Sequence, residues 1–276
     1  YLHANAPMII NGSLKTNGGI EDSMKVVFTG DRLDKPYRNF PGAWPGIYFS
    51  ETSNDNLLIN TIIKNAYQGI IAENREPGQT KITMHQCIIE NAYDAGIIAV
   101  ASSLEVNNTL ITNCGKGIIL GYGGDYLFRH VTAANIANNY MISKTPVLTV
   151  TNYIVSEEVV YTNGLSAIFQ NSIFWGDGSL VEDEVAVLKE GSSLFDVSFE
   201  NCIWKIKEEP AVGTFSNMIT SDPLFDSVNI SQNYYNFRLK EGSPAIDAGK
   251  PGVLATDILG NPRSSSQPDI GAYEKD

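Results

Sequence analysis

The chain has 276 residues, and its 31 acidic against 19 basic side chains leave a formal net charge of -12. A surface this acidic repels phosphate backbones, so we expect no nucleic-acid partner. No apolar run approaches the roughly 18 residues that cross a bilayer, and the three scattered cysteines suit neither a disulfide framework nor a zinc site.

The N-terminal part predicts a truncated first repeat followed by an insert. The chain begins Tyr1-Leu2-His3, without an initiator methionine or a signal sequence, so we expect a piece of a longer protein. Residues 30–49 predict a loop rich in aromatic and arginine side chains. Such a loop can stack on a sugar ring and hydrogen-bond it, and its candidate ligand-binding residues are Arg32, Tyr37, Arg38 and Trp44. Alternatively Trp44 only shields the first repeats, which is the role that we favour.

A sequence repeat follows the insert. Residues 59–65, 85–91, 107–113 and 129–135 resemble one another, and their closing asparagines lie 26, 22 and 22 residues apart. Fainter copies begin at Asn152, Asn171 and Asn201. A period this short, made of β-branched runs, excludes pairs of helices, which need roughly 33 to 47 residues. The repeat predicts an all-β parallel solenoid over residues 1–240, with roughly nine or ten coils of about 22 residues stacked about 4.8 Å apart.

Marker residues within the repeat predict the corners and the core of each coil. The closing residues Asn65, Asn91, Asn113 and Asn135 are expected to form a ladder of side-chain amides along one corner. Gly69, Gly96 and Gly117 are expected to supply tight bends. The column expected to point inward consists of Ile63, Ile89, Ile111, Ala133, Val155, Phe174 and Trp204.

Charged residues in the aligned coils predict ion pairs, not an active site. Glu90 falls beside Lys64, and Asp94 falls beside Lys116 and Gln68. Such pairs on a solvated face are worth about 0.2–1 kcal/mol each. No two carboxylates stack in the aligned coils, and we therefore expect no catalytic residue there.

Two irregular stretches offer further candidates. Three glycines break the repeat at residues 121–124, where Tyr122, Asp125 and Arg129 line a groove or only a looser corner. The acidic stretch 177–184 has oxygen ligands but lacks the spacing of a calcium-binding loop, so a solvated loop is favoured over a Ca²⁺ site. We expect no cofactor and no metal.

The repeat and the flanking motifs resemble a known family. The likeness rests on residues 26–34 and 41–49, on the block 57–142, and on five closing motifs, 222–225, 236–239, 243–249, 257–263 and 269–274. The chain resembles right-handed parallel β-helix repeat proteins of the pectin-lyase-like superfamily. More narrowly, it looks like the β-helix domain of secreted or outer-membrane lipoproteins of anaerobic Gram-negative bacteria. The resemblance implies a single-stranded right-handed parallel β-helix at the cell surface or outside the cell.

The closing motifs predict how the chain ends. Residues 241–276 are expected to close the end of the helix as a separate segment. Its acid–arginine pairing is expected to be structural, and it involves Asp257, Arg263, Asp269 and Glu274.

Two functions remain open from the sequence. The first is a non-catalytic surface module that binds polysaccharide or another cell-surface component, or serves as a rigid scaffold. The second is a polysaccharide lyase or glycoside hydrolase, the activities that the superfamily resemblance implies, with its active residues beyond position 156. We favour the first and expect a monomer.

Overall fold

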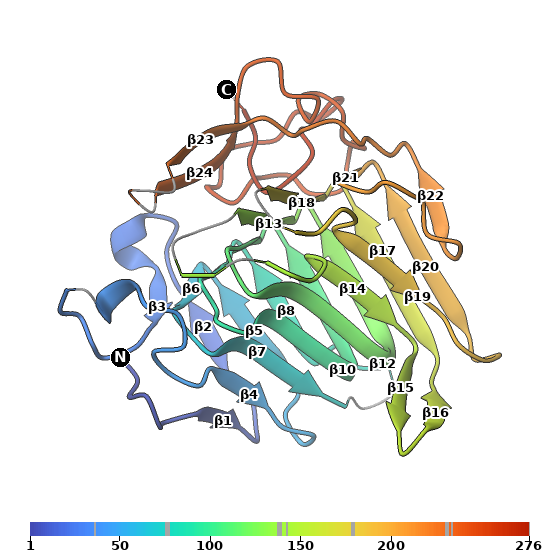
Figure 1. Cartoon of the computed structure of the whole chain (residues 1–276). Coiled ribbons are helices and arrows are strands. Elements are labelled where there is room, and N and C mark those ends of the chain that lie inside the picture. The colour runs from blue at the N-terminus through green and yellow to red at the C-terminus, as the bar shows by residue number, and fades with distance from the viewer. Residues whose placement is uncertain are drawn as a thin grey trace.

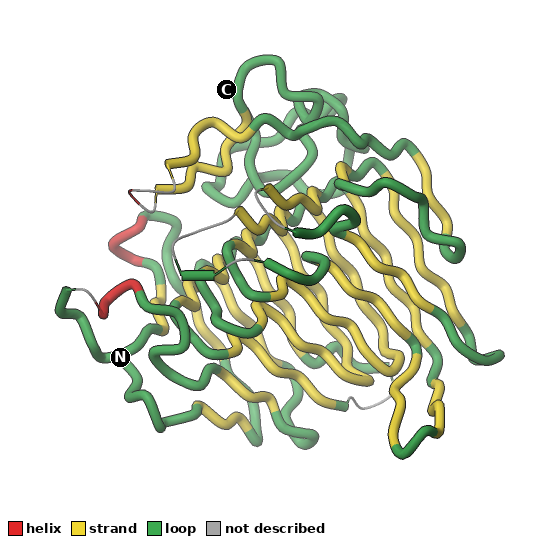
Figure 2. The backbone as a smooth tube through the Cα atoms, in the orientation of Figure 1, coloured by secondary structure: helices red, strands yellow, loops and turns green. Residues whose placement is uncertain are grey.

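Each coil of the fold is made of three strands. The computed structural model describes residues 1–35, 37–74, 78–136, 140–141, 143–177, 180–229, 232 and 234–275. These residues lie almost entirely in strands and loops, and η1 (Asp22–Met24) and η2 (Tyr37–Asn39) are short 3-10 helices. Strands of successive coils pair in parallel and wind into a right-handed parallel β-helix (Figures 1 and 2). None of the described helices is long and apolar enough to cross a membrane.

The helix has three sides. The first side contains β1 (Met8–Ile10), β4 (Ile47–Phe49), β7 (Gln68–Glu73), the first parts of β10 (Ala95–Asn107) and β12 (Lys116–Arg129), β14 (Leu148–Thr151) and β19 (Val185–Leu188). The second contains β2 (Lys15–Asn17), β5 (Asn56–Ile59), β8 (Ile82–His85), the second parts of β10 and β12, β17 (Leu165–Gln170), β20 (Phe195–Glu200) and β22 (Thr214–Ser216). The third contains β3 (Val26–Phe28), β6 (Thr61–Lys64), β9 (Ile88–Glu90), β11 (Leu110–Thr112), β13 (Thr132–Ile136), β18 (Ile173–Asp177) and β21 (Ile203–Trp204).

The number of coils is smaller than the repeat suggested. Among the described residues the third side has seven strands, one from each coil, and β22 begins an eighth coil. The expected nine or ten coils were too many, because two parts of the chain leave the winding in the described residues. One is the antiparallel hairpin of β15 (Tyr153–Ser156) and β16 (Val159–Thr162), and the other is the C-terminal segment after β22.

Alternation along each strand puts one set of side chains inside the helix. On the third side Ile63, Ile89 and Ile111 are paired in register and buried, followed by Ala133, Phe174 and Trp204. Val155 was wrongly assigned to this column. It lies on the hairpin, where it is exposed, because its sequence only imitates the repeat. The three cysteines are buried and free, and burial raises the pKa of each thiol to about 12.

Left-handed residues turn the chain at two corners. Between the second and third sides the φ angle is positive at Asn60, Gln86, Asn108, His130, Asn171, Asn201 and Asn217. Between the third and first sides it is positive at Asn65, Asn91 and Asn113. Gly69, Gly96 and Gly117 do not adopt this conformation, contrary to the expectation of tight bends. They are needed because the next coil is too close: a Cβ on Gly96 would lie 2.8 Å from the carbonyl oxygen of Gly117.

The C-terminal segment covers the outer face of the third side. Gln86 and Asn108, at one corner, donate side-chain hydrogen bonds to the carbonyl oxygens of Asp257 and Thr256. Asn171 and Asn201 hold the carbonyl oxygens of Lys250 and Ala248 in the same way. The segment therefore runs along several coils instead of closing the end of the helix (Figure 1). The outer face of the third side carries apolar side chains, and the C-terminal segment buries them. Removing this apolar surface from water is the physical reason why the segment lies along the coils.

Arg263 makes several of the side-chain hydrogen bonds that hold the end of this segment together. Its guanidinium is buried and donates to Glu274 at 3.0 Å, to the side chain of Asn108 and to three backbone carbonyls of residues 269–272. Asp257 and Asp269 instead accept backbone N–H groups. The segment also includes β23 (Phe225–Asn229) and β24 (Tyr234–Leu239), which pair antiparallel.

Candidate functional site

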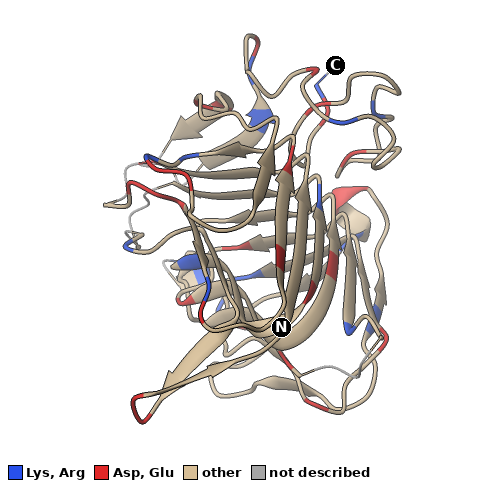
Figure 3. Ribbon diagram, turned by 90° about the vertical axis from the view of Figure 1, so that its right-hand side faces the viewer, with Lys and Arg blue, Asp and Glu red and all other residues tan. Residues whose placement is uncertain are grey.

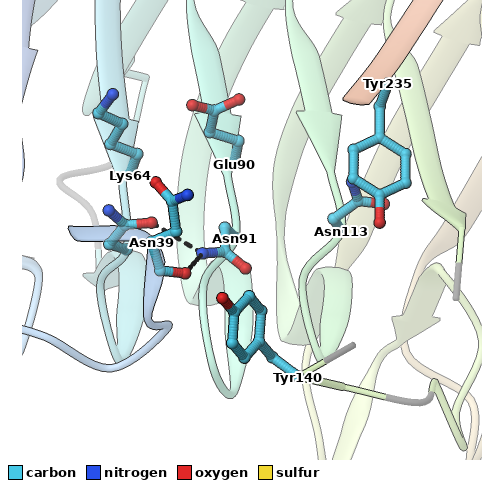
Figure 4. Close-up of a pocket in the computed structure, with 8 residues that line it drawn as sticks. Asn39, Lys64, Glu90, Asn91, Asn113, Tyr140 and Tyr235 are labelled. Carbon is cyan, nitrogen blue, oxygen red and sulfur yellow. Dashed lines mark hydrogen bonds between the residues drawn. The ribbon is translucent and has the colours of Figure 1, made fainter. Parts of the chain in front are cut away.

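A pocket lies on the outer face of the third side, in the part that the C-terminal segment leaves open. Its volume is about 140 Å³. It is lined by Asn39, Lys64, Asn65, Glu90, Asn91, Asn113, Tyr140 and Tyr235. The sheet supplies the floor, while η2 and β24 supply Asn39 and Tyr235 from the two flanking segments (Figure 4).

Lys64 and Glu90 lie side by side on the floor. They occupy paired positions at the ends of β6 and β9, as the repeat predicts. Among the described ion pairs and hydrogen bonds, none involves either side chain, so the expected Lys64–Glu90 ion pair on a solvated face is wrong. Glu90 is half-buried, and the loss of solvent around it raises the pKa of its carboxyl group, although Lys64 opposes that rise. A carboxyl group of this kind, in a pocket, is a candidate functional group.

The corner asparagines form part of the pocket wall. The side-chain amide of Asn91 donates to Oδ1 of Asn65 at 2.7 Å and to the backbone oxygen of Asn39 at 2.9 Å (Figure 4). The expected amide ladder exists for this pair but does not continue. Oδ1 of Asn113 accepts the backbone N–H of Ile136. Asn135 lies within β13 rather than at a turn, and its Oδ1 accepts the N–H of Cys114.

Two tyrosines enter the pocket from outside the sheet. Tyr235 extends from β24, and its hydroxyl is buried without a hydrogen-bond partner among the described residues. Burial also raises the pKa of this hydroxyl. Tyr140 packs edge-on against Phe40, with ring centroids 5.2 Å apart. A buried hydroxyl without a hydrogen-bond partner costs free energy. The position of Tyr235 therefore favours a bound group that forms a hydrogen bond with its hydroxyl.

Of the four candidates in the insert, Arg38 lies nearest to the pocket. Its backbone oxygen accepts the amide of Asn65, and its side chain lines an adjoining cavity of about 630 Å³ that shares Asn39 and Lys64 with the pocket. Arg32 instead pairs with Asp34 at 2.9 Å and lies over the ring of Tyr37.

Trp44 is a buried residue of the insert. It is fully buried against the first coils, and its indole N–H donates to the backbone oxygen of Lys64 at 2.9 Å. It also lines a separate, largely apolar cavity on the first side of the helix.

Tyr122, Asp125 and Arg129 do not line the pocket. They follow one another along β12, on a different side of the helix. Tyr122 is left-handed at the bend of that strand. Arg129 binds Glu105 and Asn107 of the coil below, which is a structural ladder on the second side.

The structure offers no support for a metal site within the described residues. No group of three or more His, Cys, Asp or Glu side chains there could hold an ion. Residues 178 and 179 of the acidic stretch lie outside the described residues. Glu184, in the same stretch, is buried, and its carboxylate accepts the N–H of Val147 at 3.0 Å, so this end of the stretch is not a solvated loop.

The sequence analysis names the five lining residues that the sheet and its corners supply, but not as a pocket, and it misses the other three. Asn39, Tyr140 and Tyr235 come from segments that show no periodic pattern, and nothing in the sequence indicates that they meet. The available signals are the Lys64–Glu90 pair and the corner asparagines Asn65, Asn91 and Asn113. They predict a surface ion pair and an amide ladder, because the repeat does not show that other segments cover this face. By contrast, the Asp94–Lys116 pair forms as predicted, at 3.0 Å, with Gln68 donating to Asp94 at 2.7 Å.

Comparison with known proteins agrees with the fold. Residues 9–141 match the family model described as right handed beta helix region. No curated protein matches the sequence of the chain. The match includes the first coils and the sheet floor of the pocket, and it carries no information on chemistry.

Proposed function

We propose that this chain, which is a right-handed parallel β-helix repeat protein, is a non-catalytic module that binds glycan in the pocket around Glu90. The observation that carries the proposal is a pocket wall made of amides, hydroxyls, Lys64 and Glu90, in which the buried hydroxyl of Tyr235 has no hydrogen-bond partner among the described residues. By family resemblance, the module would work at the cell surface or outside the cell.

The chemistry of the wall suits a sugar. Each sugar hydroxyl both donates and accepts hydrogen bonds, and side-chain amides and tyrosine hydroxyls offer both functions. Tyrosine rings also present an apolar face, against which the C–H groups of a sugar ring can pack. The hydroxyl of Tyr235 would gain the partner that it lacks.

Glycan cleavage is the second candidate, and one observation favours it. Burial raises the pKa of Glu90, which is a property of a general acid. Hydrolysis of a glycosidic bond nevertheless uses two carboxyl groups about 5 to 9.5 Å apart. Glu90 is the one acidic residue among the described residues that line the pocket, so binding is the better-supported function.

A glycan array that holds neutral and uronic-acid oligosaccharides tests the proposal. We expect the purified chain to bind a subset of these glycans, and we expect Asn91→Ala to reduce that binding at least fivefold. Asn5→Ala, at an exposed position far from the pocket in sequence, is the control.

Incubation of the bound glycans with the chain separates the two candidates. Unchanged glycans support a binding module. New reducing ends or unsaturated products would show that the chain is an enzyme and would overturn the proposal. A complete lack of binding would leave only a scaffold role.

A further inference from the structure

The hairpin of β15 and β16 projects away from the coils. It leaves the winding between β14 and β17 and extends beyond the body of the helix (Figures 1 and 3). Its strands pair Ile154 with Tyr161 and Val155 with Val160. Glu157 and Glu158 form a two-residue turn in which both φ angles are positive, 49° and 64°, as in the tight turns that suit the twist of a hairpin.

The two strands expose apolar side chains on both faces. Five of them, with 42% to 61% of their surface exposed, are Ile154, Val155, Val159, Val160 and Tyr161. An isolated two-stranded hairpin is marginally stable in water, and exposed strand edges normally carry lysine, proline or a bulge that prevents pairing. Neither strand carries any of these, and the hairpin register is regular. An apolar patch of this kind marks an interaction surface.

The apolar surface continues at the base of the hairpin. Leu188, which pairs with Thr151 just before β15, is exposed, and Leu194 is 69% exposed. The loop between them is attached to the hairpin, because the hydroxyls of Thr162 and Ser193 are hydrogen-bonded at 2.8 Å. Lys189 lies in this loop, and no ion pair in the described part of the chain includes it.

We propose that the hairpin is the interface of a homodimer. Two copies would meet at a two-fold axis, with their hairpins side by side and antiparallel, so that the apolar faces and the open edges cover each other. Twofold symmetry is the commonest arrangement of soluble oligomers. This dimer does not depend on glycan binding, since the hairpin lies on another part of the molecule than the pocket.

Charge complementarity identifies the occupant as a second copy. The acidic turn of Glu157 and Glu158 lies at one end of the hairpin (Figure 3), and Lys189 lies at the other. A four-residue strand spans about 13 Å, so antiparallel packing brings the acidic turn of one copy to Lys189 of the other. None of these three side chains has an ion-pair partner in the described residues of its own chain. The pairing opposes the repulsion between two chains that each carry a net charge of -12.

Sedimentation equilibrium of the purified chain over a wide concentration range tests the dimer. We expect a reversible dimer for the native chain. The double variant Val155→Lys with Val160→Lys should weaken association at least tenfold, because it buries charge in the apolar contact. The control is Met24→Lys with Leu33→Lys, which makes the same change of charge at two other exposed apolar residues. Circular dichroism and the unfolding temperature of each variant establish that the coils remain folded.

Charge reversal tests the antiparallel arrangement. Lys189→Glu, and separately Glu157→Lys with Glu158→Lys, should each weaken the dimer. The combination of all three changes should restore it. A native chain that is monomeric at every concentration, a dimer that the hairpin lysines leave unchanged, or a triple variant that stays as weak as its parents would overturn the proposal.

Discussion

Arg263 donates a hydrogen bond to the side chain of Asn108 at 3.0 Å, although the two residues are 155 positions apart. Asn108 turns the chain between two sides of the helix, and Arg263 belongs to the segment that covers the third side. One side chain therefore ties the C-terminal segment to a coil. The same guanidinium holds Glu274 and the backbone of residues 269–272.

The first prediction concerns this tie. Arg263→Met should lower the free energy of unfolding by about 3–5 kcal/mol, because it leaves the carboxylate of Glu274 and several buried carbonyl groups without their partner. Urea unfolding followed by circular dichroism measures the change. Lys240→Met removes an exposed cation from the same segment and should change stability by less than about 0.5 kcal/mol. Equal effects of the two substitutions would show that Arg263 does not hold the segment.

The second prediction concerns the close stacking of the coils. Gly96→Ala places a Cβ 2.8 Å from the carbonyl oxygen of Gly117 and 2.8 Å from Cγ2 of Ile111. A backbone oxygen cannot move without the whole coil, so we expect a loss of about 1–3 kcal/mol in unfolding free energy. Gly12→Ala, where nothing lies within 4 Å of the new Cβ, is the control and should have little effect. If Gly96→Ala left the free energy of unfolding unchanged, the coils would be further apart than described.

The third prediction concerns the pH dependence of stability. The pKa of Glu90 is raised in the folded protein, so the folded state binds this proton more tightly than the unfolded state does. Protonated Glu90 therefore contributes stability at acidic pH. This contribution is lost as the pH rises from about 4.5, the ordinary pKa of a glutamate, through the raised pKa of Glu90 in the folded protein. Glu90→Gln removes this dependence.

The comparison is made on unfolding free energies between pH 4 and pH 8. The stability of Glu90→Gln relative to the native chain should increase from acidic to neutral pH. Glu190→Gln, at an exposed site, is the control for the general effect of removing a carboxylate. A difference between Glu90→Gln and the native chain that stays constant with pH would contradict the enclosed position of Glu90.

The fourth prediction concerns the cysteines. Cys87, Cys114 and Cys202 are buried, and burial raises the pKa of each thiol to about 12, so neither access nor ionisation favours reaction. A thiol reagent at pH 8 should label none of them within minutes in the folded chain and all three in urea. Fast labelling of the native chain would show that the coils open more readily than their packing implies.

The architecture could be predicted because it repeats. Each coil must place its apolar side chains inside and an asparagine or another tolerant residue at a left-handed corner, so the same pattern recurs at Ile63, Ile89 and Ile111. The stacking partners of Asp94 followed from the same register.

The rest depends on parts of the chain that do not repeat. The hairpin imitated a repeat because its valines and tyrosine have the same strand propensity as a coil. The C-terminal segment was placed at the end of the helix because the sequence cannot show which apolar face of a regular solenoid needs a cover. The pocket arises where that cover stops, so its tyrosines could not be foreseen.

The central claim is that the pocket around Glu90 binds glycan, and calorimetric titration with the glycan that the array selects tests it most directly. Tyr235→Phe removes the buried hydroxyl that lacks a partner, and Tyr234→Phe makes the same change at the neighbouring exposed position of β24. We predict that Tyr235→Phe weakens binding three- to tenfold, since a hydrogen bond is worth about 0.5–1.5 kcal/mol, and that Tyr234→Phe leaves it unchanged. Equal affinity of the native chain and both variants would contradict the account.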